Sequence, residues 1–289
     1  MMSVKESEVR SLVYLLEDPD PSVQDGIKSR FLELGEQIIP MLDRFKNETS
    51  AEHERSSIHE VMYELTLHSV LEDYTDLIQS GVTSREDLEN ALLLLSRLEE
   101  PTLRTSDYQR KLDQFAREIG PEISYNPSLE EKMKILLRYI FKELRFRGDA
   151  KNYHNTDNAY LHRVIDRRKG LPIMLSMVVL SLARRLHLPF YGVNMPIHFM
   201  LMYKRPGGDL LIDPFDAGRI VTTDQCYYFL KRNSIEPRPE HLHRATELQI
   251  LARCIRNLMH SYAKKDQMER AQDLQIMLDL TERAEESSL

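Results

Sequence analysis

The sequence contains no tryptophan, and only two of its 289 residues are cysteines. Cys226 and Cys254 provide neither a disulfide framework nor the spacing of a metal site. Both fall in helical patterns with apolar neighbours, so we predict buried free thiols in a reducing compartment. We expect the protein to hold no metal and no cofactor.

The sequence also has no long hydrophobic run. Its most apolar stretch, Leu171 to Leu182, extends over about a dozen residues between Lys and Arg side chains and is too short to span a bilayer. The first residues contain no apolar stretch of signal-peptide length. We therefore predict a buried helix at this stretch, a cytoplasmic protein and no membrane partner.

A surplus of basic residues is missing as well. The formal net charge of -7 argues against a nucleic-acid partner. The charges are uneven, because residues 1–100 carry 22 acidic and 9 basic side chains, whereas residues 138–169 carry 9 basic and 4 acidic ones. Two interpretations stay open: the two regions pair with each other within the chain, or they present a polar surface to a partner.

Helical periodicity dominates the first part of the chain, and strand-like patterns follow later. Asp20-Pro21-Ser22 predicts a helix start, and the apolar pattern after it resembles one HEAT-type helical hairpin. Four short runs predict a small antiparallel sheet: 190–193, 198–203, 210–212 and 219–221.

These patterns predict a mostly helical α+β protein in three parts. Residues 1–120 form a helical N-terminal lobe, residues 121–235 form a core that contains the sheet, and residues 236–289 form a helix pair. The spacing of Leu258, Tyr262 and Ala271 in this pair resembles a single tetratricopeptide unit. One such unit cannot close a solenoid, so we expect it to pack on the core.

Short motifs predict where individual helices begin and end. Thr83-x-x-Glu86 and Ser128-x-x-Glu131 have the pattern of capping boxes, and Gly120-Pro121 predicts a helix end. Gly170 suits the left-handed turn that ends one helix, and Pro172 suits the first turn of the next.

The order of residues from 170 to 214 matches a known chemical arrangement with one member missing. Thiol chemistry of the cysteine-protease and transglutaminase type needs a cysteine at a helix N-terminus, a histidine base on a strand, and an aspartate that orients the histidine. Here His198 and Asp213 occupy the last two places, and Pro172 occupies the place of the cysteine. Proline has neither a nucleophile nor an N–H group, so the attacking atom is gone.

The same segments resemble a known bacterial family. Asn158-Ala159-Tyr160-Leu161, Val164 to Ile173 and Leu211 to Phe215 are similar to the SirB-one family, which has a transglutaminase-like core and a tetratricopeptide tail. In that family proline is usual in the cysteine slot. The resemblance implies a fold and an ancestry but no established reaction.

Other residues near this stretch are candidates for binding or catalysis. Ser176 lies one turn after Pro172 and could present a hydroxyl to His198, although helix packing explains a serine there equally. The polar candidates for a binding pocket are Asn152, Asn155, Asn158, Arg167 and Arg168, for which turn, capping and ion-pair roles are the alternative.

We consider three functions. The leading one is a non-catalytic interaction or regulatory module whose former active-site cleft binds a peptide or protein segment. The second is a hydrolase or acyl-transferase that uses His198 and Asp213 with Ser176 or a water molecule. The third is a sensor of small molecules or anions at Asn155 and Arg168. The sequence does not identify the partner or the oligomeric state.

Overall fold

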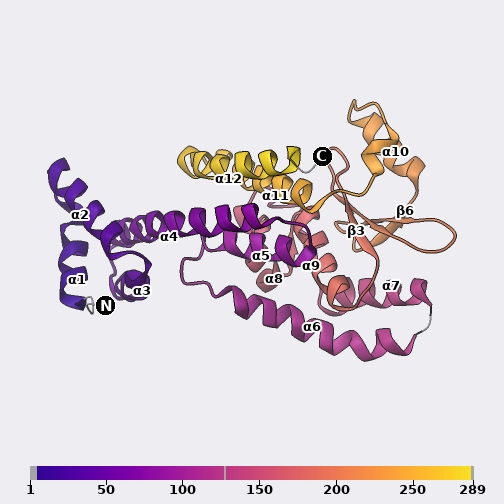
Figure 1. Cartoon of the computed structure of the whole chain (residues 1–289), viewed down its shortest axis with the longest axis horizontal. Helices are drawn as coiled ribbons and strands as arrows, with labels where there is room; N and C mark the ends of the chain where they lie inside the picture. The colour runs from indigo at the N-terminus through magenta and orange to yellow at the C-terminus, as the bar shows by residue number, and fades with distance from the viewer. Residues whose placement is uncertain (1–4, 127, 288–289) are drawn as a thin grey trace. The chain divides into compact units, whose positions relative to one another are not determined.

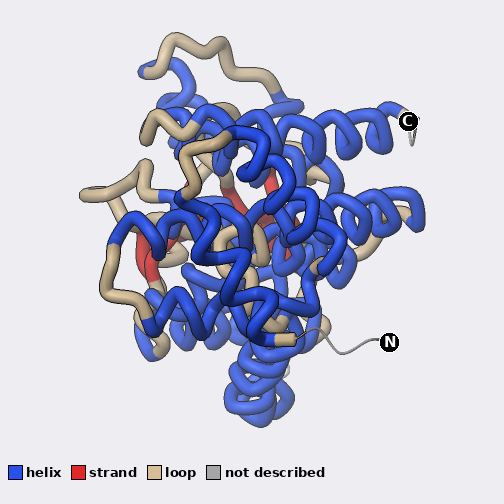
Figure 2. Tube along the Cα trace, turned by 90° about the vertical axis from the view of Figure 1, so that its left-hand side faces the viewer, coloured by secondary structure: helices blue, strands red, loops and turns tan. Residues whose placement is uncertain are grey.

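The computed structural model describes residues 5–126 and 128–287, most of which are helical, with a minor share in strands (Figure 2). The chain divides into two compact units. The first comprises residues 1–74 with 94–104, and the second comprises residues 75–93 with 105–289. The predicted α+β class with a small antiparallel sheet is confirmed. The three predicted part boundaries stay a prediction.

The first unit is built from short helices around one apolar core. Asp20 caps α2 by accepting a bond from the Ser22 N–H at 2.9 Å, and Pro21 is the first residue of that helix, as predicted. Fully buried side chains such as Phe31 and Leu42 fill the space between the helices. The helices are α1 (Glu6–Tyr14), α2 (Pro21–Leu34), α3 (Ile39–Glu48) and the first part of α4 (Glu52–Ser80).

The helices that follow correct two of the predicted ends. The cap of α5 (Arg85–Ser96) is formed by Ser84 and Asp87, one residue later than the predicted box, because Asp87 accepts bonds from the Ser84 N–H and hydroxyl. Helix α6 (Thr105–Tyr125) continues through Gly120-Pro121 instead of ending there. Glycine has no Cβ to clash with the proline ring, and Ile123 beyond it is buried.

Helix α7 (Leu129–Arg138) begins at the Ser128 cap, as predicted, where Ser128 Oγ accepts a bond from the Glu131 N–H. The helix then widens into a π-helical turn at Tyr139–Glu143, which the sequence did not indicate. Within the described residues, no helix has both the length and the apolar character that a membrane crossing would require.

Four antiparallel strands form the sheet in the order β3-β4-β5-β6, close to the predicted runs. Asp213 is paired with Arg219, and Leu211 is paired with Val221, so these four side chains lie on one face. Helix α10 (Thr223–Arg232) packs on that face through Cys226 and Leu230, and α9 (Pro172–Arg185) lies against β3 and β4. The strands are β3 (Phe190–Val193), β4 (Met200–Tyr203), β5 (Leu210–Asp213) and β6 (Arg219–Val221).

The segment before α9 differs from its prediction. Helix α8 (Leu161–Arg167) ends at Arg168, which adopts the left-handed conformation with φ of 59°, so the prediction that Gly170 makes this turn is wrong. Gly170 instead lies in β2 (Lys169–Gly170), which pairs in parallel with β1 (Arg147–Gly148). A Cβ on Gly170 would come within 2.6 Å of Val164 Cγ2, so close packing requires the glycine.

The C-terminal helices α11 (Glu247–Ala263) and α12 (Met268–Glu286) lie side by side as a pair (Figure 1). The pair packs on the core, as expected, because the hydroxyl groups of Tyr262 and Tyr160 are 2.7 Å apart in the buried interior. Helix α11 also reaches the loop after β3, where Arg253 donates to the carbonyl oxygen of Met195 at 2.6 Å.

Candidate functional site

His198 and Asp213 form the predicted pair. Nε2 of His198 lies 2.9 Å from Oδ1 of Asp213, and the two side chains are 17% and 19% exposed. Burial alone would raise the pKa of Asp213. The hydrogen bond and charge of His198, with the N–H groups of Phe215 and Asp216, instead hold this pKa below its ordinary value. The carboxylate is therefore ionised and orients the imidazole.

The loop before His198 is strained. The His198 N–H donates to the Pro196 carbonyl at 2.8 Å, which closes a three-residue turn around Ile197. Ile197 has a φ of 67°, a region that β-branched residues rarely adopt, and its side chain is 54% exposed. Arg253 holds the loop from α11 by donating to Asn194 and Met195. Strain of this kind persists only where the surrounding contacts enforce it.

A hollow of about 130 Å³ opens beside the pair on the face of the sheet that α10 covers. His198 and Asp213 form its polar wall, together with Arg219 from β6 and Gln225 from α10. The ring centre of Phe229 lies 5.8 Å from that of His198. The remaining wall is apolar: Met195, Met200, Val221 and Cys226 also line the hollow.

Cys226 carries a thiol to this hollow, and the sequence analysis did not assign it to the site. Both cysteines are buried and free, as predicted, but the turn between β6 and α10 brings Cys226 to the same hollow as His198. Burial raises the pKa of the Cys226 thiol, and the negative charge of Asp213 raises it further. The thiol is thus protonated at neutral pH and is a poor nucleophile. No spacing rule could have found it, because the contact depends on the sheet register.

Pro172 is buried in the first turn of α9, as predicted. The assignment of Pro172 to the place of a lost nucleophile stays a prediction. Ser176 follows one turn later and is fully buried. Its hydroxyl donates to the Pro172 carbonyl at 2.9 Å. This bond explains the serine as a helix-packing residue, since the hydroxyl proton already has an acceptor within its own helix. A role for Ser176 in catalysis stays untested.

Phe215 packs between the pair and the segment that precedes α9. The Phe215 and His198 ring centres are 6.3 Å apart, and Tyr153 meets the other side of Phe215 at 6.0 Å. A Cβ on Gly148 would lie 2.4 Å from Phe215 Cε2, so the ring lies directly against the backbone of β1. The Phe215 ring therefore lies beside both the His198 ring and the backbone of β1.

The predicted asparagines belong to a self-contained polar network. Asn158 donates to the Asn152 carbonyl at 2.7 Å and accepts from Arg167 at 3.2 Å. Arg167 also pairs with Asp157 at 3.4 Å and contacts the buried Asp149 at 3.5 Å. These bonds hold the loop before α8 in place.

Asn155 and Arg168, the predicted anion pocket, make different contacts. Asn155 caps the 3₁₀ turn at Thr156–Asn158 by accepting from the Asp157 N–H at 3.2 Å. The guanidinium of Arg168 lies between two rings, 4.6 Å from the centres of Phe115 and Phe146. Burial lowers the pKa of Arg168. These contacts give both residues structural roles, and binding of an anion by them stays a prediction.

Arginines at the end of α9 form ion pairs within the second unit. Arg185 forms two hydrogen bonds to the buried Glu89, at 2.7 and 2.8 Å, and a third to Asp113. Arg184 pairs with Glu86 at 2.8 Å. Basic residues at the end of α9 therefore pair with acidic residues of the preceding helices. Helix α9 lies outside the basic region 138–169, so pairing of that region with residues 1–100 stays an open interpretation.

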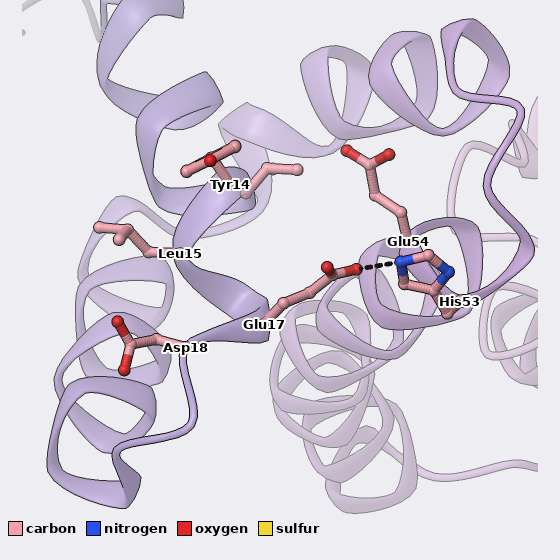
Figure 3. A pocket seen from close by; sticks show the side chains of 7 residues that line it. Tyr14, Leu15, Glu17, Asp18, His53 and Glu54 are labelled. Carbon is pink, nitrogen blue, oxygen red and sulfur yellow. Dashed lines mark ion pairs between the residues drawn. The ribbon is translucent and has the colours of Figure 1, made fainter.

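A larger hollow in the first unit is a weaker candidate (Figure 3). It has a volume of about 320 Å³ and is lined by carboxylates, with Tyr14 exposed at its rim. Its one ion pair, between His53 and Glu17 at 2.8 Å, joins side chains that are 71% and 46% exposed. An exposed pair is screened by solvent and gives little pre-organisation. Among the described residues, no cluster of His, Cys, Asp and Glu has the geometry to hold a metal ion.

Comparison with known proteins gives a consistent result. A family model described as the transglutaminase-like superfamily matches residues 106–256, which include His198, Asp213 and Pro172. A UPF0162 protein of Xylella fastidiosa is 30% identical over 190 residues, which cover 64% of this chain and 68% of that protein. A UPF0162 protein of Pseudomonas aeruginosa is 36% identical over 159 residues, or 53% of this chain and 57% of that protein.

A third similarity is shorter. F-box only protein 21 of Mus musculus is 32% identical over 111 residues, which cover 35% of this chain and only 18% of that protein. No solved structure matches the chain. The family model covers more than half of the chain, and the Xylella protein is matched over two thirds of its length. The chain therefore belongs to the transglutaminase-like superfamily and, within it, to the UPF0162 proteins.

Proposed function

We propose that the protein is a non-catalytic interaction module built on an inactivated transglutaminase-like fold, which binds an extended peptide or protein segment beside His198 and Asp213. The observation that carries the proposal is the buried Pro172 at the helix start, where the chemistry needs a thiol. Because the orienting pair survives without a nucleophile, its remaining use is recognition.

The shape of the site favours an extended partner. The hollow of about 130 Å³ has room for one side chain, and its apolar lining suits an aliphatic one. Strand β6 is the last strand of the sheet, so one of its edges is unpaired within the described residues. An extended segment can pair with such an edge while one of its side chains enters the adjacent hollow.

The resemblance to the SirB-one family supports the same proposal. The helix pair α11 and α12 resembles one tetratricopeptide unit, and helical repeats of this kind commonly serve recognition. Arg253 of α11 holds the loop that carries His198. A partner bound at the hollow would therefore also lie close to the helix pair.

A peptide-display experiment tests the proposal. Peptides selected on the wild-type protein should lose at least about tenfold in affinity for Phe229→Asp and for Arg219→Glu, because both residues line the rim of the hollow and each change alters its charge. The control is Ile276→Asp on α12, since Ile276 is 51% exposed and lies outside the hollow. Selected peptides that bind the two rim variants and the control equally well would refute the proposal.

The second candidate is a hydrolase or acyl-transferase that uses His198 and Asp213 with water or Ser176. The intact bond of 2.9 Å between the pair favours it. The test is turnover of an activated ester such as p-nitrophenyl acetate. Saturable turnover that His198→Ala abolishes would establish the enzyme, whereas equal slow turnover in both proteins would leave only the interaction module.

A further inference from the structure

Three cationic side chains surround one tyrosine on the edge strand β3. The Cζ atom of Arg244 lies 4.2 Å from the centre of the Tyr191 ring, and the Cζ atom of Arg85 lies 4.8 Å from it. The Nζ atom of Lys204 lies 5.6 Å from the same point. The four residues come from separate segments of the second unit, so the fold assembles the cluster.

The cluster carries an excess of positive charge. Its one carboxylate partner is Glu247, which lies 3.6 Å from Arg244 and is 13% exposed. Within the part of the chain that the structure describes, Arg85 and Lys204 form no ion pair. Three cations and one carboxylate leave two positive charges. Burial lowers the pKa of Arg85; Tyr191 and Glu247 partly offset this, and the charge of Arg244 lowers the pKa further.

Attraction to the ring does not account for all three cations. The negative potential of an aromatic ring lies on its two faces, so it favours two cations. The third gains little from the ring. All three charged groups lie within 5.6 Å of the same ring centre, so like charges are gathered at distances comparable to the Debye length of about 8 Å. An arrangement of this kind is stable when an anion lies between the cations.

The geometry points to a binding site for a phosphate monoester group at Arg85, Tyr191, Lys204 and Arg244. A phosphate monoester carries a charge of about -1.5 to -2 at neutral pH, which matches the excess of the cluster. The planar forks of the two arginines can each form paired hydrogen bonds to phosphate oxygens. Lysine adds a mobile point charge.

The surface beside the cluster has room for the rest of a phosphorylated molecule. Arg244 also borders a hollow of about 550 Å³, lined in part by Asn194 and Arg256. Glu240 and Glu285 line the same hollow. These two carboxylates repel anions, so the phosphate group belongs at Tyr191 and the uncharged part of the ligand belongs in the hollow.

Calorimetric titration tests the site, with inorganic phosphate as the probe and chloride added to hold ionic strength constant. The wild type should bind phosphate, and Arg85→Gln and Arg244→Gln should each weaken binding by about fivefold or more. Glu247→Gln should tighten binding by about twofold to threefold, because it removes the one opposing charge. A purely structural cluster would not predict this gain.

Two controls make the result specific. Arg232→Gln removes a single arginine that lies 6.0 Å from the Tyr228 ring, and phosphate binding should not change. If Arg85→Gln does not fold, Lys204→Gln replaces it, because Lys204 is exposed. Phosphate binding no stronger than chloride binding, or equal binding by the wild type and Arg244→Gln, overturns the inference.

A second arm identifies the source of the phosphate. A phosphoserine peptide is compared with its unphosphorylated form and with inorganic phosphate. Tighter binding of the phosphopeptide assigns the site to a phosphorylated protein segment, and equal binding assigns it to free phosphate compounds. Binding of both peptide forms alike, without binding of inorganic phosphate, overturns the inference. The outcome is independent of the hollow at His198, since the two sites share no residue.

Discussion

Two ion pairs in the second unit differ in the solvent exposure of their side chains. Glu89 and Arg185 are 1% and 10% exposed, and Arg185 makes two bonds to that carboxylate and a third to Asp113. His198 and Asp213 are 17% and 19% exposed and border a hollow. Arg185 borders a hollow of about 450 Å³, but the carboxylate of Glu89 is enclosed. In the second pair both side chains line the hollow.

The contrast separates a structural pair from a candidate site. A buried charge needs a partner whatever the protein does, so Glu89 and Arg185 are explained by their burial alone. His198 and Asp213 border a hollow and follow a strained turn at Ile197, which burial of a charge does not explain. A functional role for this pair is therefore our proposal.

The largest expected effect comes from breaking the structural pair. Glu89→Ala leaves Arg185 with a buried charge and should lower the free energy of unfolding by about 3–5 kcal/mol. Chemical denaturation measures this change. The control is Glu86→Gln on the same helix, where the carboxylate is 61% exposed and the expected loss is below about 1 kcal/mol. Equal losses for both variants would contradict the prediction that the buried pair contributes more to stability than the exposed pair.

The second prediction concerns the packing that positions α9. A methyl group on Gly170 would meet Val164 Cγ2 at 2.6 Å and Cγ1 at 2.9 Å, so Gly170→Ala should cost about 1–3 kcal/mol. Gly26→Ala in α2 has open space and should instead gain up to about 1 kcal/mol from helix propensity. Thermal unfolding of the two variants measures both changes, a loss of stability for Gly170→Ala and a gain for Gly26→Ala. A neutral Gly170→Ala would show that the start of α9 tolerates repacking.

Gly170 also shows what the sequence could and could not predict. The helix end, the buried apolar helix and the proline at its start were all predicted, because periodicity and capping are local. The left-handed residue is Arg168, however, and Gly170 is required by a contact with Val164 across the turn. A glycine signals a constraint, but the sequence alone does not distinguish a backbone angle from close packing.

The same limit applies to the candidate site. The order of His198 and Asp213 along the chain was enough to predict the pair, because their spacing is a property of the sequence. The approach of Cys226 and Phe215 depends on strand register and on the angle at which α10 returns to the sheet. Long-range geometry of this kind leaves no local pattern.

The third prediction tests whether Asp213 stabilises the fold as an ion. Its pKa lies below the ordinary value of 3.8, so its contribution is complete well above that pH and is lost as the pH falls through the folded-state pKa. Asp213→Asn should therefore lower the free energy of unfolding by about 1–3 kcal/mol at pH 7. Urea denaturation at several pH values should show a smaller difference below about pH 4.

The control for this prediction is Asp216→Asn. Its carboxylate is 56% exposed and pairs with Arg219 at the surface, so the expected loss is below about 1 kcal/mol. If the loss for Asp213→Asn were the same at pH 7 and pH 3, the hydrogen-bond geometry alone would explain the effect. The carboxylate would then contribute nothing as a charge.

The smallest effect is expected for Ser176→Ala, which asks whether the site has a hidden nucleophile. The hydroxyl donates to the Pro172 carbonyl at 2.9 Å, and its loss should cost about 0.5–1.5 kcal/mol. Alanine regains roughly 0.5 kcal/mol through helix propensity, so thermal unfolding should change little. Hydrolysis of p-nitrophenyl acetate should also stay unchanged. If Ser176→Ala and His198→Ala both removed a saturable hydrolysis, the serine would have to leave Pro172 and attack, and the pair of His198 and Asp213 would belong to an enzyme rather than to a binding surface.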